Sequence, residues 1–484
     1  MTRGALRAWL LLPFGLLLLG GCGGLVDSEA ASVPVVDAGG VPPPLQFPDA
    51  GHSFDVFVPA RPVEAGGGRL DTGVATRDGT FDVLRPVDAP GETSIVDSGV
   101  DSFLADGGWL IAPHYPMPTV TDYGGNVIAK PVLTAVTFPH YDLLAEAQQF
   151  VSSVGSTPYW ASVVGEYGVG PGTANPPIEL TETPPVSIDD SAVQTWLAGK
   201  LDGAAANAAF GTPTSQSVYV IFYPTGTSVT LQGLMSCVEG GFDGYHNSVQ
   251  LTAGPWSGLN VTYAVVPECA YMVTAAESLS ETASHELIEA TTDPLPLTQM
   301  PTYASTDEND IVWDIILGGG EVADMCAQNP NAEFLPAGFI YPVQRSWSNQ
   351  AALAGHDPCQ PAQAGIPYFN SIPRLNAAVN LTYQGQIAPT YGLSIPIGGK
   401  ETVEVDLFSD ASISDWTVSA SDLSEDVGGG PYLGFSWDQT TGNNGTKLHL
   451  TITVLKAGVF GGQPFEIASS TGSLANYWLG FVGQ

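Results

Sequence analysis

The chain has 484 residues, with 49 acidic side chains against 13 Lys and Arg, and its formal net charge is −36 at pH 7. This excess of negative charge excludes a nucleic-acid-binding surface, because acidic surfaces repel the phosphate backbone. The length exceeds that of one ordinary domain, and 57 Gly and 39 Pro indicate many loops, linkers and β structure.

The N-terminus has the pattern of a bacterial lipoprotein signal over residues 1–21. Arginines precede an apolar run, Ala8–Leu19, which is too short to span a membrane and ends in small residues before Cys22. We expect Cys22 to be the lipidated first residue of the mature chain, and an ordinary secretory signal is the alternative. Gly23 favours anchoring in a Gram-negative outer membrane, on either face.

Residues 22–107 are predicted to form a disordered tether. They are rich in Asp, Gly, Ala, Val and Pro, with repeated short units such as Val36–Gly39 and Val96–Asp101. No helical or strand period persists, so the segment cannot bury enough apolar surface to offset the entropy cost of ordering it. A tether of this length would hold the rest of the chain tens of ångströms from the membrane.

Residues 108–362 are predicted to form an α/β or α+β domain, because strand and helix patterns alternate along them. Runs of β-branched residues indicate strands, and apolar residues at helical spacing indicate helices. The predicted strands are Val127–Phe138, Ser217–Tyr223, Val261–Val266 and Tyr341–Trp347, and the predicted helices are Tyr141–Val154, Pro158–Tyr167, Ser191–Ala209 and Thr274–Pro294.

The last of these helices, Thr274–Pro294, carries the most informative motif of the chain, the His-Glu-x-x-Glu sequence HELIE at 285–289. At 3.6 residues per turn, His285 and Glu289 lie on one face and Glu286 lies about 100° away. Zinc peptidases place two ligands four residues apart beside an intervening Glu, with His where this chain has Glu289. The motif therefore predicts a metal or catalytic site, and a solvent-facing helix is the alternative.

The four cysteines after Cys22 predict two disulfides, because an even number in an exported protein is typical of a disulfide framework. Three connectivities are open, and we favour Cys237–Cys269 with Cys326–Cys359, since each pair brackets one segment around the motif helix. Zinc binding by these residues is disfavoured, because no two lie at Cys-x-x-Cys spacing.

Two acidic segments follow the motif helix. The run DEND at 307–310 is rich in oxygen ligands and makes Ca²⁺ a candidate there, with a solvated turn as the alternative. The segment GGGEVADMC at 318–326 places Glu321 and Asp324 after a flexible glycine hinge. We expect one of these carboxylates to be a further metal ligand or to orient a ligating histidine, and capping of a helix or loop is the alternative.

Residues 366–484 are predicted to form an all-β sandwich, because short alternating segments recur with turn residues between them. No convergent acid–base cluster occurs here, so we expect a spacer or binding module. His449 alternates with Leu448 and Leu450, which predicts an exposed strand position. The predicted strands are Val379–Tyr383, Thr402–Phe408, Ser414–Ala420, Gly434–Trp437, Lys447–Val454, Phe465–Ser469 and Asn476–Phe481.

The middle of the chain, about residues 109–360, resembles the plant phosphate-induced (Exordium-like) proteins and their exported bacterial relatives. Asp293-Pro294 stands where the plant members have Asn-Pro, which adds a candidate oxygen ligand. The similar segments are Ser284–Pro294 (SHELIEATTDP), Glu321–Cys326 (EVADMC), Gln344–Asn349 (QRSWSN) and a Gly-rich, His-containing loop, Gly240–His246 (GGFDGYH).

The resemblance implies a metallopeptidase-like site. The positions that match the metal site of that family are His246, His285 and Glu289, with Asp324 or Glu321 beside them. Fold and site are carried over by this resemblance, and a specific reaction is not.

These residues together predict a metal-dependent hydrolase, in the first place a peptidase acting on a peptide or protein. His285 and Glu289 would bind Zn²⁺ from one helix face, and His246 would approach from the preceding loop. Glu286 would take a proton from the activated water and pass it to the leaving amine. A carboxylate in place of an imidazole also makes Mn²⁺ or Ca²⁺ a credible ion.

The alternative function is that of a non-enzymatic surface lipoprotein. Its site would be a structural or relic metal site, and its β-sandwich would bind a polymer or a partner. A serine hydrolase is disfavoured, because no Gly-x-Ser-x-Gly elbow precedes a helix. In either case we expect a monomer attached to the membrane through Cys22, with no nucleic-acid partner.

Overall fold

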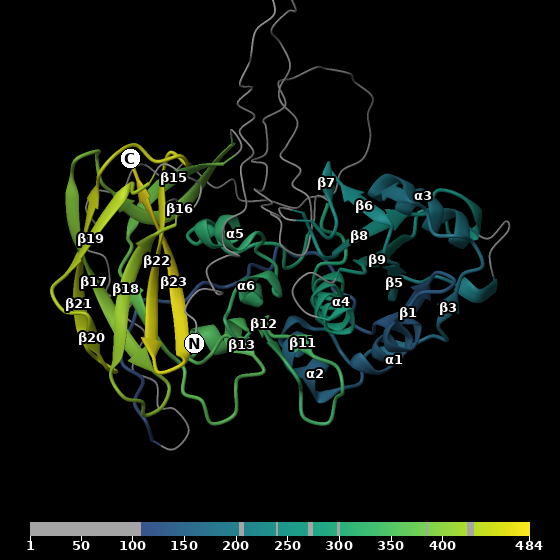
Figure 1. Ribbon diagram of the computed structural model, residues 1–484, viewed down its shortest axis with the longest axis horizontal. Helices are drawn as coiled ribbons and strands as arrows, with labels where there is room; N and C mark the ends of the chain where they lie inside the picture. The colour runs from purple at the N-terminus through teal and green to yellow at the C-terminus, as the bar shows by residue number, and fades with distance from the viewer. Residues whose placement is uncertain are drawn as a thin grey trace, which may run out of the picture.

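The computed structural model describes residues 108–202, 208–238, 241–269, 274–297, 301–383, 386–423 and 430–484. The predicted signal, Cys22 and the predicted tether lie outside these described residues. Within them, a mixed α/β region is followed by a part built of β-sheets, as predicted (Figure 1). Among the helices of these ranges, none has the length and apolar character needed to cross a membrane.

A mixed β-sheet forms the centre of the α/β region, with the strand order β2-β1-β5-β9-β8 and β3 also paired to β1. Strands β2, β1, β5 and β9 run parallel to one another, whereas β8 pairs antiparallel with β9. All seven residues of β5 are buried, as expected for a strand that is covered on both faces. The strands are β1 (Val132–Thr137), β2 (Thr173–Ala174), β3 (Ile178–Glu179), β5 (Ser217–Tyr223), β8 (Tyr245–Gln250) and β9 (Asn260–Pro267).

Helices cover both faces of this sheet. Because side chains alternate along a strand, Val218, Val220 and Phe222 join one core and the residues between them join the other. The first core holds α1 (Leu144–Val154), α2 (Pro158–Val164) and α4 (Ala275–Thr292). The second core holds α3 (Asp190–Leu201) and β6 (Ser228–Leu231), which lies in a small sheet with β4 (Ser187–Asp189) and β7 (Leu234–Met235).

Several predicted elements differ from the observed ones. The strand predicted at Val127–Phe138 begins only at Val132, because Pro131 lacks the N–H that a ladder position needs. The helix predicted at Ser191–Ala209 ends at Leu201, and residues 203–207 lie outside the described ranges.

The single strand predicted at Tyr341–Trp347 is wrong, because the segment forms two short strands with different partners. β11 (Val343–Gln344) pairs with β10 (Glu333–Phe334), and β12 (Ser346–Trp347) pairs with β13 (Cys359–Gln360). Arg345 lies between them, and its N–H donates to the carbonyl of Ala332, the residue before β10, at 2.7 Å.

Both favoured disulfides are confirmed. Cys237–Cys269 joins the segment before β8 to the segment after β9. Cys326–Cys359 joins α6 (Asp324–Ala327) to β13. The two bridges close chain segments of 32 and 33 residues, and each lies next to a segment that builds the site described below.

Replacing Cys326 and Cys359 by Ala is expected to lower the free energy of unfolding by about 2–4 kcal/mol, because the unfolded chain is no longer constrained by this bridge. Urea unfolding followed by circular dichroism measures the change. The pair Cys237 and Cys269 closes a segment of nearly equal size and should lose a similar amount when it is replaced. A loss below about 1 kcal/mol for both pairs would contradict this account.

The C-terminal part consists of two sheets, with the strand orders β14-β17-β21-β19 and β15-β16-β23-β22-β18-β20 (Figure 1). The Trp416 indole in β18 donates to Ser371 Oγ in β14 at 3.0 Å, so the two sheets face each other as in the predicted β-sandwich. The strands are β14 (Phe369–Pro373), β15 (Ala377–Tyr383), β16 (Gln386–Ser394), β17 (Lys400–Ser409), β18 (Trp416–Asp422), β19 (Leu433–Trp437), β20 (Thr441–Gly442), β21 (Lys447–Val454), β22 (Gly462–Thr471) and β23 (Leu474–Gly483).

Three of these strands were not predicted. β16 contains Pro389 and Gly392, both of which weaken a strand pattern, and β14 and β20 are short. His449 in β21 is exposed, as predicted, and its ring lies 2.8 Å from Asp438 Oδ2.

The α/β region and the sandwich contact each other through aromatic side chains. Trp313 in α5 (Ile311–Leu317) has its ring centroid 5.1 Å from that of Trp478 in β23. His114, close to the start of the described chain, stacks on Phe408 at 3.7 Å. The two parts therefore share one continuous apolar core.

Candidate metal centre

Helix α4 carries the motif into the interior of the α/β region. Its first turn is fixed by a capping box, in which Thr274 and Glu277 each bond the other's backbone N–H. Its second half is buried against the sheet, and the exposed fractions are 3% for His285 and 0% for both Glu286 and Glu289. The motif is thus not on a solvent-facing helix.

His246 comes from the neighbouring edge strand β8, which corrects its predicted place in a loop. The backbone of β8 passes very close to α4, because Gly244 has no side chain. A Cβ there would lie 2.5 Å from Thr282 Cγ2 and 2.8 Å from Glu286 Oε1. This approach leaves His246 Nδ1 3.8 Å from Glu286 Oε2 and 3.8 Å from Glu289 Oε2.

The glycine run after α5 brings in the two later carboxylates, and it is tightly packed, which corrects the predicted flexible hinge. A Cβ at Gly319 would collide with the Asp324 carboxylate, and one at Gly320 would collide with the Asp314 carboxylate. The Asp324 N–H donates to Glu289 Oε1 at 3.1 Å, which joins this turn to the motif helix.

The His285 ring is oriented by Gln344, a role that the sequence analysis did not predict. Gln344 Nε2 donates to Ala323 O at 2.9 Å, so its Oε1 faces the ring and accepts from His285 Nδ1 at 3.0 Å. In the neutral ring that a metal ligand requires, Nε2 carries the lone pair, 3.1 Å from Glu289 Oε2 and 3.4 Å from Asp324 Oδ1. An imidazole held through one nitrogen, with the other among carboxylates, has the arrangement of a metal ligand.

The His246 ring is oriented in a similar way by the main chain. Its Nε2 lies 3.1 Å from Asp293 O, and because a carbonyl only accepts, Nε2–H is the donor. Nδ1 of the neutral ring therefore carries its lone pair toward α4. The Asp293 carboxylate, predicted as a further oxygen ligand, instead accepts from the Thr302 N–H at 2.7 Å and so fixes the chain after the helix.

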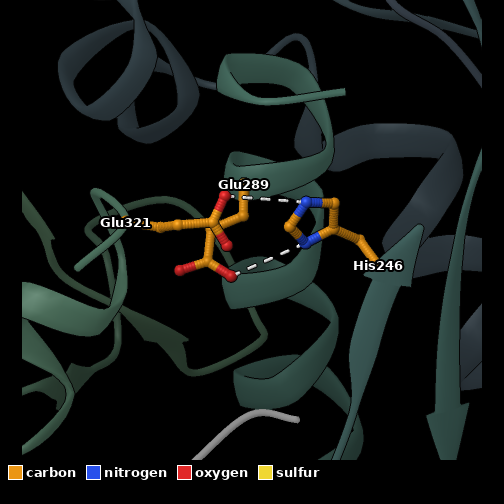
Figure 2. A group of neighbouring side chains, drawn as sticks. All are labelled: His246, Glu289 and Glu321. Carbon is orange, nitrogen blue, oxygen red and sulfur yellow. Dashed lines mark ion pairs between the residues drawn. The ribbon is translucent and has the colours of Figure 1, made fainter. Parts of the chain in front are cut away.

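The donor atoms form two groups. His246, Glu289 and Glu321 make the first group, and His285, Glu289 and Asp324 make the second. In each group, one donor atom from every residue lies within 4.8 Å of the others. Figure 2 shows the first group, in which the two nitrogens of His246 face a different carboxylate each, 3.8 Å from Glu289 and 3.7 Å from Glu321. All five predicted ligands thus belong to one group or the other, and Glu289 belongs to both.

The donor set fits a divalent cation. Imidazole nitrogen and carboxylate oxygen are ligands of Zn²⁺, and carboxylates also suit Mn²⁺. Burial, followed by the charge of Asp324, raises the pKa of Glu289 to about 8. Burial lowers the pKa of His285, but the charge of Glu289 and side-chain hydrogen bonds with Asp324 and Glu289 outweigh it and place this pKa well above its usual range. Burial is therefore the main cause of the Glu289 shift, whereas the neighbouring carboxylates cause the His285 shift against the effect of burial.

The acidic run at 307–310, predicted as a candidate Ca²⁺ site, forms a local turn. Asp307 Oδ1 accepts from the Asn309 N–H at 2.7 Å, and Asn309 O accepts from the Tyr391 N–H of the sandwich at 2.7 Å. Burial raises the pKa of Asp310 well above its usual range. Within the described ranges, the His, Asp and Glu groups close enough to hold a metal ion are the two around Glu289, and this turn is not among them. Ca²⁺ at this turn stays a prediction.

Comparisons with known proteins found no match: no family model, no curated protein and no solved structure matches the chain. The resemblance to the Exordium-like proteins therefore stays a prediction.

Gln344→Leu is expected to weaken metal binding about 10–100-fold, because His285 loses the amide that orients its ring. Titration with Zn²⁺ against a competing chelator measures the affinity. Gln149→Leu is the matched control, since that amide bonds the Tyr341 hydroxyl, and it should leave the affinity unchanged. Equal affinity of Gln344→Leu and the unaltered protein would show that the ring needs no such support.

Proposed function

We propose that this chain is an exported metal-dependent hydrolase, and in the first place a peptidase, whose divalent ion is bound against Glu289. One observation carries the proposal. The fully buried Glu289 Oε2 lies 3.1 Å from His285 Nε2 and 3.8 Å from His246 Nδ1, and both of these nitrogens are turned toward it by other hydrogen bonds. Two oriented lone pairs aimed at one carboxylate are expected of ligands that share a cation.

The neighbouring residues suit hydrolysis. A bound divalent ion supplies a Lewis acid that activates water near neutral pH and polarises a carbonyl group. Glu286 lies beside His246, with its carboxylate 3.8 Å from Nδ1. In the proposed reaction Glu286 accepts a proton from the attacking water and passes it to the leaving amine. Gln344 and the main chain at Asp293 keep the two rings in place.

Substrate has to reach a centre that is buried. The most exposed of its ligating side chains are Asp324, at 8%, and His285, at 3%. We therefore propose that substrate approaches from the side of these two residues, past the half-buried Glu281 one helical turn earlier. Burial and the charge of Glu333 raise the pKa of Glu281 to about 7, so this carboxyl beside the approach loses its proton only near neutral pH.

The same burial favours a second candidate function, a non-enzymatic surface protein with a structural metal centre. Structural sites are closed by protein ligands, whereas catalytic sites keep a position open for water. In this case the β-sandwich would bind a polymer or a partner. For either function we propose attachment to the outer membrane through a lipid on Cys22.

Assays of the purified protein with and without metal separate the two candidates. The protein is stripped with a chelator and reloaded with Zn²⁺ or Mn²⁺, and casein and peptide hydrolysis are measured beside the melting temperature. Hydrolysis that depends on the ion supports the hydrolase. A melting temperature that rises with the ion, without hydrolysis of any substrate tried, supports the structural centre. Failure to bind either ion would rule out both proposals.

A further inference from the structure

We propose that the centre holds two divalent cations, bridged by the Glu289 carboxylate. This inference rests on the metal-binding part of the proposed function and goes beyond the single ion expected from the motif. Glu289 is the only residue shared by the two groups of ligating side chains. A single ion bound in one group would leave the other group's imidazole and its unshared carboxylate without a cation.

The two groups reach Glu289 from different parts of the fold. His246 is supplied by the edge strand β8, and His285 is supplied by α4 itself. The Asp324 N–H holds Glu289 Oε1 at 3.1 Å, while Oε2 faces both rings, 3.1 Å from His285 Nε2 and 3.8 Å from His246 Nδ1. A carboxylate fixed through one oxygen and aimed with the other between two imidazoles is placed to bridge.

The later turn supplies one carboxylate to each group. Asp324 Oδ1 lies 3.4 Å from His285 Nε2, the nitrogen assigned as the ligand of that ring. Glu321 Oε1 lies 3.7 Å from the His246 ring on its Nε2 side, and one Glu321 oxygen lies within 4.8 Å of donor atoms of His246 and Glu289. The Glu321 N–H also donates to Asp324 Oδ2 at 3.3 Å, which sets the spacing between the two side chains. The short turn therefore serves both groups, and each group has its own imidazole and its own carboxylate.

Charge supports a second ion. Four carboxylates are buried together, namely Glu286, Glu289, Glu321 and Asp324, with exposed fractions of 0%, 0%, 1% and 8%. Metal ligands bind in their deprotonated forms, so the count is made with all four carboxylates ionised and both imidazoles neutral. One divalent ion would then leave two negative charges unmatched, and buried charges are costly unless they are matched. Two divalent ions match all four. The nearby basic side chain Arg345 is directed elsewhere, to the carbonyls of Asn331 and Pro361.

A bridged pair of ions also suits the proposed chemistry. Two-metal hydrolases hold their ions a few ångströms apart and use them to stabilise both the attacking and the leaving group. Glu286 lies beside His246, so the proton transfer would take place next to the ion held in the group of His246, Glu289 and Glu321.

The number of bound ions tests the inference. The full chain is purified, stripped with a chelator, loaded with Zn²⁺ alone, and its metal content is measured by mass spectrometry after removal of excess ion. We expect two ions per chain, and one in each of Glu321→Gln and Asp324→Asn, because each variant disables one group. Glu281→Gln, on α4 but in neither group, is the matched control and should keep two. Circular dichroism confirms that each compared variant is folded.

The outcomes are distinct. One ion per chain in the unaltered protein would overturn the bridged pair and leave the proposed metal site intact, whereas no ion would overturn the site as well. Loading with Mn²⁺ guards against a second ion bound elsewhere on the acidic surface. Two bridged Mn²⁺ ions give an exchange-coupled electron paramagnetic resonance spectrum, and a spectrum of two isolated ions would also overturn the inference.

Discussion

Glu289→Ala is expected to abolish tight binding of a divalent ion and, with it, the stabilisation that the ion provides. Among the described residues, Glu289 is the carboxylate shared by both groups and faces both imidazoles, so its loss removes a ligand from each group. At free metal about 100 times the dissociation constant, binding adds about 2.7 kcal/mol to the free energy of unfolding. We expect this gain in the unaltered protein and almost none in the variant, measured by urea unfolding with and without Zn²⁺.

Glu281→Gln provides the comparison for this result. Glu281 lies two helical turns before Glu289 on α4, is only partly buried, and belongs to neither group. This variant should keep the full gain in stability from metal. A Glu289→Ala protein that is folded and still stabilised by Zn²⁺ as strongly as this control would refute the assignment of Glu289 as a ligand.

Glu286→Gln is expected to lower kcat for hydrolysis about 10²–10⁴-fold while metal content and KM stay close to those of the unaltered protein. Glutamine has nearly the shape of glutamate but cannot accept the proton from the attacking water. Hydrolysis of casein and of a peptide substrate gives the rate constants, and elemental analysis gives the metal content. Glu401→Gln, at an exposed position of β17 in the sandwich, serves as the control and should retain the rate.

Two results would contradict the role of Glu286. Full activity of Glu286→Gln would show that the proton is accepted elsewhere. If the variant loses its metal together with its activity, Glu286 is a ligand of the ion. Its carboxylate is close enough for that role, 3.8 Å from His246 Nδ1.

The fold could be predicted best where local signals were strong. The β-branched run Ser217–Tyr223 is a buried strand with the predicted ends. Helix α4 was bounded correctly to within a few residues, because Thr274 caps its start and Asp293-Pro294 stops it. Strand β8, which pairs with the next strand β9, was missed because the sequence GGFDGYH around its start is typical of a loop.

The site could be predicted in its residue types but not in its grouping. The HELIE motif and its spacing led to His285 and Glu289, since both follow from helical geometry. Spacing gives no information about which of Glu321 and Asp324 lies near which histidine, because that depends on a turn packed by glycines. Gln344 orients His285 from 59 residues away, and such a contact has no local sequence signal.

The central claim is that a divalent cation lies against Glu289, and anomalous X-ray scattering tests it most directly. Crystals of the Zn²⁺-loaded protein are measured on both sides of the zinc absorption edge. The account predicts an anomalous peak at about 2.0–2.2 Å from His285 Nε2 and from a Glu289 oxygen. A well-ordered α4 with no peak there, and with His285 bonded directly to Glu289, would contradict it.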